Sequence, residues 1–140
     1  MTDTTHDHTG FEIPADLEDP AGRSIDHKLL GELMGAALDG CTTCQDPLLS
    51  ILVEDPTTTA RLVELACIAT HAALGGLPPS MTDPAVPGTS SQEFRRLAAT
   101  GVDGANDRMF KVCEQMTSTE RRAAANTALD TLAGLLASGM

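Results

Sequence analysis

The chain has 140 residues, a length typical of one domain with a real hydrophobic core. Its net charge of -11 disfavours binding to nucleic-acid phosphates, and with neither Trp nor Tyr it offers bases no obvious stacking platform. No apolar run reaches the ~20 residues that span a bilayer, and residues 1–20 lack the basic and apolar segments of a secretory signal. We therefore expect a cytoplasmic protein without nucleic-acid or membrane partners.

The acidity belongs to the N-terminal part of the chain. Residues 1–55 hold twelve Asp and Glu against only Arg23 and Lys28, whereas residues 56–140 hold eight acidic and seven basic residues. Residues 1–22 mix Thr, Asp, Pro and Gly without a hydrophobic period, which predicts a flexible acidic tail. The remaining residues, 23–140, are expected to form a single helical domain.

Hydrophobic periodicity predicts three helices in the first half of this domain, residues 23–76. The first runs from about residue 24 to 39 and ends at Gly40, a typical position for a left-handed residue. Asp46 and Pro47 predict the start of a second helix, to about residue 54, because a capping side chain followed by proline suits a first turn. Asp55 and Pro56 repeat this signal before a helix of about five turns that ends at Gly75 and Gly76.

The second half, residues 90–140, is joined to the first by a Pro-rich loop over 77–89. Ser90 and Glu93 have the spacing of a capping box and predict the start of a fourth helix. A fifth helix follows around residues 109–116, and a second capping box, Thr117 and Glu120, begins the last. The pattern predicts an all-α fold, an irregular bundle of about five or six helices.

Three cysteines and a histidine have spacing that suits a metal site. Cys41 and Cys44 form a C-x2-C turn, and Cys67 and His71 are four apart on the predicted long helix, hence on one face. Three thiolates and an imidazole make a closed tetrahedral zinc set. Our leading interpretation is therefore a structural zinc site in a non-catalytic protein-protein interaction or regulatory module. Its acidic surface suits a basic protein partner, and self-association stays open.

A redox function of Cys41 and Cys44 is the alternative. Cys44 precedes the predicted helix start at Asp46, where the helix dipole would stabilise a thiolate and lower its pKa. The segment GAALDGCTTC, residues 35–44, resembles the dithiol segment of the alkylhydroperoxidase and carboxymuconolactone decarboxylase family, whose fold is also helical. The resemblance implies a thiol oxidoreductase or peroxidase. It departs from the family at Leu48, where peroxidase members have a proton-relay histidine, and at Leu29, where they have a glutamate.

We interpret the remaining cysteine and the arginine pairs as structural rather than functional residues. Cys113 shares an apolar stripe with Met109 and Met116, which predicts a buried core thiol, with a fourth metal ligand as the alternative. The pairs Arg95-Arg96 and Arg121-Arg122 are interpreted as surface charge. The chain contains no nucleophile elbow, P-loop, H-E-x-x-H or dinucleotide-binding glycine motif.

Overall fold

The computed structural model describes residues 25–83, 85, 90–100 and 108–137. Over these ranges it is all-helical, as predicted, with six α-helices, one short 3-10 helix and no strand. The elements are α1 (His27–Leu38), α2 (Thr42–Leu52), α3 (Pro56–Leu74), η2 (Pro79–Met81), α4 (Gln92–Ala98), α5 (Arg108–Gln115) and α6 (Ser118–Ala137). The predicted flexible tail, residues 1–22, lies outside the described residues. None of these helices combines the length and apolar character that crossing a membrane requires.

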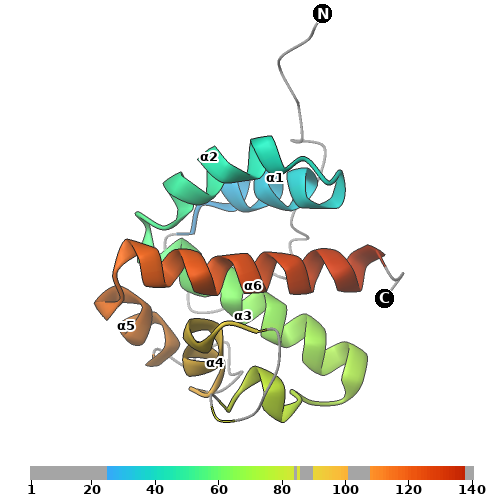
Figure 1. The fold of residues 1–140 in the computed structure, drawn as a ribbon, viewed down its shortest axis with the longest axis vertical. Coiled ribbons are helices and arrows are strands. Elements are labelled where there is room, and N and C mark those ends of the chain that lie inside the picture. Colours follow the sequence, from blue (N-terminus) through green and yellow to red (C-terminus); the bar gives the residue numbers. More distant parts are fainter. Residues whose placement is uncertain (1–24, 84, 86–89, 101–107, 138–140) are drawn as a thin grey trace, which may run out of the picture.

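The last helix, α6, lies at the centre of the bundle. Figure 1 shows α1 and α2 side by side on one side of α6, with α3, α4 and α5 on the other. The most extensive packing joins α3 to α6, whereas α2 packs mainly against α1. One continuous core fills the space between these helices, and its largest fully buried apolar side chains are Phe94, Leu30, Leu33, Leu52, Leu62, Leu97, Met109 and Leu129.

The ends of α3 follow the predicted signals. Asp55 caps its first turn by accepting hydrogen bonds from the backbone N–H groups of Thr57 and Thr58 at 3.2 and 3.3 Å. Gly75 ends the helix with φ at 76°, in the left-handed region that glycine adopts without steric cost. These start and stop predictions are therefore confirmed, because each depends on residues within one helical turn.

The beginning of α2 was predicted wrongly. The helix starts at Thr42, with Cys41 at the N-cap position, instead of at Asp46 and Pro47. Pro47 therefore lies inside the helix, where it has no N–H to donate to the carbonyl of Thr43. Thr43 is exposed, so water can satisfy that carbonyl. Asp46 forms an ion pair with Arg122 of α6.

The two capping boxes of the second half have different outcomes. Ser91, not the predicted Ser90, caps α4 by accepting a hydrogen bond from the N–H of Phe94 at 3.2 Å. The box at α6 is confirmed in both directions. The N–H of Thr117 donates to Glu120 at 2.9 Å, and the N–H of Glu120 donates to the Thr117 hydroxyl at 3.1 Å. These bonds lower the pKa of Glu120, with the backbone bond to Thr117 as the largest cause.

Arg121 joins three helices through backbone carbonyls. Its Nε donates to Val53 O at 2.6 Å, and its Nη1 donates to Cys113 O at 3.1 Å and also to Met116 O. These acceptors lie at the ends of α2 and α5, where the last carbonyls lack an N–H partner four residues later. The carbonyl of Cys113 also accepts the N–H of Met116 at 3.1 Å. The interpretation of Arg121 as surface charge was wrong, because this half-buried guanidinium holds helix ends together.

Replacing Arg121 with Met should lower the free energy of unfolding by about 2 kcal/mol, because three carbonyls lose a charged donor. Arg122→Met is the matched control. Among the described residues, Arg122 bonds to two exposed side chains of α2, Ser50 and Asp46, so we expect a loss of at most about 0.5 kcal/mol. Urea unfolding followed by circular dichroism measures both values, and equal losses for the two variants would contradict the assigned role.

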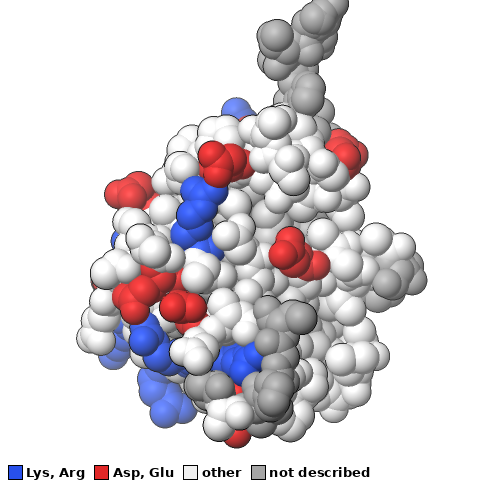
Figure 2. Space-filling model, in the orientation of Figure 1, with Lys and Arg blue, Asp and Glu red and all other residues white. Residues whose placement is uncertain are grey.

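Figure 2 shows that basic and acidic side chains lie next to each other on the surface over the first half of α6.

Candidate functional site

The turn between α1 and α2 places two thiols side by side. Gly40, with φ at 69°, reverses the chain, and the N–H of Cys41 donates to Ala36 O at 2.9 Å. Cys41 then occupies the N-cap of α2, and the N–H of Cys44 donates back to Cys41 O at 3.2 Å. The two sulfur atoms are hydrogen-bonded at 2.8 Å, both side chains are half-buried, and both residues are present as thiols. The helix start thus fixes a vicinal dithiol.

The two thiols have different surroundings. The pKa of Cys44 is raised, first by its hydrogen bond with Cys41, then by burial and by the negative charge of Cys41. Thr43 contributes a hydroxyl 3.5 Å from the Cys41 sulfur. Cys41 also lies at the N-terminus of α2, where the helix dipole favours a thiolate. The prediction of a lowered pKa for Cys44 was therefore wrong, because the neighbouring Cys41 favours its protonated form.

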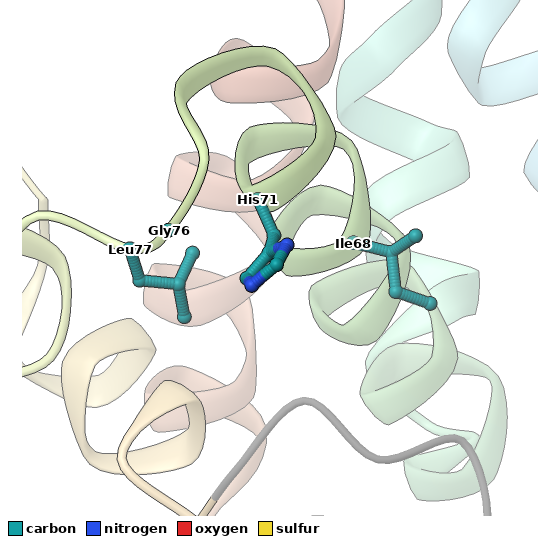
Figure 3. A pocket seen from close by; sticks show the side chains of 4 residues that line it. All are labelled: Ile68, His71, Gly76 and Leu77. Atoms are coloured by element: carbon teal, nitrogen blue, oxygen red, sulfur yellow. The ribbon is translucent and has the colours of Figure 1, made fainter.

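Cys67 and His71 do not join this pair. Cys67 lies in the middle of α3, fully buried in the core, and burial, followed by the charge of Glu64, raises the pKa of its thiol to about 12. His71, one turn later, is exposed and lines an open pocket of about 570 Å³ with Ile68, Gly76 and Leu77. Figure 3 shows its imidazole between Ile68 and Leu77. One of the two predicted ligands is thus enclosed by the core while the other faces solvent.

The arrangement of the helices explains this separation. From their shared turn, α2 and α3 diverge on opposite sides of α6 (Figure 1), because α2 packs mainly against α1 and α3 packs mainly against α6. Within the described ranges, no group of three or more His, Cys, Asp or Glu side chains is arranged to hold a metal ion. The four-residue zinc set therefore does not fit the described geometry, and zinc binding stays a prediction.

The fourth cysteine is a core residue, as its sequence pattern predicts. Cys113 on α5 is fully buried and belongs to the main hydrophobic cluster. Burial raises the pKa of its thiol to about 12, although the nearby charge of Arg121 acts in the opposite direction. A thiol that is fully buried and protonated is inaccessible to substrates and to metal ions. Cys113 therefore serves as an internal control for the half-buried pair.

An ion pair lies inside the bundle and was not predicted. Arg61 and Glu64, both on α3, are only 2% and 1% exposed and bond to each other. The sequence gives no signal for its burial, because Thr57, Arg61, Glu64 and His71 share one face of α3, a pattern typical of a solvent-facing stripe. Arg95 on α4 was also misread as surface charge. It is 3% exposed and donates to Asp83 O at 3.2 Å.

No match was found when the chain was compared with models of protein families, with curated proteins and with solved structures. The short resemblance of residues 35–44 to a dithiol segment therefore assigns no family. The function has to be argued from the residues of this chain.

Proposed function

We propose that the protein is a thiol-disulfide oxidoreductase in which Cys41 is the nucleophile and Cys44 is the resolving thiol. The observation that carries this proposal is the 2.8 Å separation of the two sulfur atoms. A disulfide bond is about 2.05 Å long, so the pair closes with a small side-chain movement. Both thiols are half-buried at a helix start, which leaves them accessible to a substrate disulfide.

The N-cap position of Cys41 and the raised pKa of Cys44 support the proposed order of the steps. The Cys41 thiolate attacks one sulfur of a substrate disulfide, forms a mixed disulfide and releases the first substrate thiolate. Cys44 then loses its proton, and its thiolate attacks the Cys41 sulfur of the mixed disulfide. This step forms the Cys41–Cys44 disulfide and releases the second substrate thiolate. The substrate disulfide gains two electrons, and the protein dithiol loses them.

The raised pKa of Cys44 suits its role as the resolving group. A protonated Cys44 does not compete for the first attack, and its S–H group can donate a hydrogen bond to the Cys41 thiolate. Such a bond favours the charged form of Cys41 at neutral pH. The expected substrate class is an accessible disulfide on a protein or a small molecule.

The direct test is to oxidise the reduced, full-length protein with a mild disulfide and to map its thiols. We expect one intramolecular disulfide in the tryptic peptide between Lys28 and Arg61, which contains Cys41 and Cys44 but neither of the buried cysteines. Alkylation of the unfolded product should then label only Cys67 and Cys113. A variant with Cys67→Ala and Cys113→Ala is the control and should form the same disulfide. Four alkylated thiols after oxidation would contradict the proposal.

The zinc hypothesis makes a different prediction for the same protein. A site made of the predicted set would hold one zinc per chain and would lose it on His71→Ala, whereas the dithiol reaction is indifferent to that change. The set consists of Cys41, Cys44, Cys67 and His71. No contact among the described residues favours this set, so a protein-protein interaction module with a structural zinc site stays a prediction.

A further inference from the structure

We propose that Cys41 and Cys44 also form a two-thiolate binding site for one copper(I) ion. This proposal does not depend on the redox function, because it needs only the reduced dithiol. The two sulfur atoms are already neighbours, held by a turn and the first turn of a helix. Thiolate is a soft ligand, and copper(I) is the soft first-row ion that thiolates select.

The number of available ligands decides between metals. Within the part of the chain that the structure describes, no third His, Cys, Asp or Glu joins this pair to make a metal-binding group. A structural zinc ion takes four protein ligands in a tetrahedron, so two sulfurs leave it incomplete. Copper(I), a closed-shell ion of single charge, is satisfied by two thiolates on opposite sides. Two thiolates are thus too few for a structural zinc ion but enough for copper(I).

The charge of the complex also fits its position. Two thiols bind copper(I) with the release of two protons, so the bis-thiolate complex carries one net negative charge. This charge lies at the N-terminal end of α2, where Cys41 is the N-cap and the helix dipole stabilises an anion. Thr42 and Thr43, between the two ligands, are exposed, which gives the ion a route from solvent. The sulfurs must move apart from 2.8 Å to admit it, and rotation of these half-buried side chains provides that movement.

The other two thiols are excluded by the core. Cys67 and Cys113 are fully buried, and burial raises the pKa of each to about 12, so they remain protonated. Replacing them with alanine should leave copper(I) binding unchanged. The chain therefore supplies matched cysteine variants: substitutions of Cys41 or Cys44 should weaken copper(I) binding, and substitutions of Cys67 or Cys113 should leave it unchanged.

The test is an anaerobic titration of the reduced, full-length protein with copper(I) in competition with a chromophoric copper(I) chelator. We expect one equivalent per chain in the wild type and in the variant with Cys67→Ala and Cys113→Ala. Cys41→Ser and Cys44→Ser should each weaken binding by about 100-fold or more, and the oxidised protein should not bind at all. Affinity should fall as the pH is lowered, because two protons must leave.

Two results would overturn the proposal. The first is a wild type that does not compete with the chelator. The second is binding that survives both serine substitutions, since it would assign the ion to other groups of the chain. Zinc measured in parallel separates the alternatives, because retention of one zinc that is lost on His71→Ala would support the four-residue set instead. The disulfide mapping uses no metal, so either proposal can fail without the other.

Discussion

Substituting Cys41 with Ser should abolish turnover of a disulfide substrate, with a loss of about 100-fold or more, because the thiol that ionises first is gone. Cys44 remains in this variant, and burial still raises its pKa, although the two causes that involve the Cys41 thiol are removed. Cys44→Ser should also lose turnover, for a different reason. Its Cys41 still attacks, and the mixed disulfide then accumulates because no resolving thiol remains.

A chromogenic aryl disulfide separates these two defects in a single experiment. The protein with Cys67→Ala and Cys113→Ala should release two aryl thiolates per chain and retain no adduct. With Cys44→Ser added, it should release one and carry the other as an adduct visible by mass spectrometry. With Cys41→Ser added, the first release should be at least about tenfold slower. A stable adduct in the Cys41→Ser background and none in Cys44→Ser would reverse the assigned roles.

The proposed roles predict the pH dependence. The second release requires the Cys44 thiolate, and in the mixed disulfide, where Cys41 carries no charge, burial is the cause that still raises the pKa of Cys44. Its rate should therefore rise about tenfold per pH unit while the pH stays below that pKa. The first release should level off at a lower pH, because Cys41 lies at the N-cap of α2, where the helix dipole favours a thiolate. Stopped-flow absorbance resolves both phases, and two phases that level off together would contradict the order of ionisation.

The sequence predicts those parts of this fold that depend on neighbours within one turn. The cap at Asp55, the stop at Gly75 and the Thr117–Glu120 box are predicted correctly, because each acts on backbone groups two to four residues away. The start of α2 is misread because Asp46 carries a local capping signal but bonds to Arg122, 76 residues later. Such a partner is fixed by tertiary packing, and local propensity gives way to it.

The same distinction applies to the candidate site, where contacts within one turn are predicted and contacts between helices are not. The proximity of Cys41 and Cys44 follows from their spacing of three residues over the N-cap and first turn of α2, and the C-x2-C motif predicts it. A contact of this pair with Cys67 and His71 would depend on the direction in which α3 leaves α2. Packing against α1 and α6 sets that direction, which periodicity along a single helix does not encode. Two residues on the same face of a helix also need not share an environment. Cys67 is buried in the core, whereas His71, one turn later, is exposed.

The buried pair of Arg61 and Glu64 gives the largest expected effect on stability. Glu64→Gln keeps the shape of the side chain but removes its charge, which leaves the buried Arg61 cation without this counter-charge. Because both side chains are at most 2% exposed, water cannot replace the lost interaction. We expect the free energy of unfolding to fall by about 3 kcal/mol.

Two further variants separate the net contribution of the Arg61–Glu64 ion pair to stability from the cost of removing only one of its charges. In the double variant with Arg61→Met and Glu64→Leu, apolar side chains of similar size replace both charges, and most of the lost stability should return. Arg96→Gln is the control for charge alone. Arg96 lies 3.7 Å from Glu120, with the two side chains 52% and 35% exposed, so its loss should cost at most about 0.5 kcal/mol. Urea unfolding of the four proteins measures these differences. A Glu64→Gln variant as stable as Arg96→Gln would mean that the buried charge of Arg61 is compensated elsewhere in the bundle.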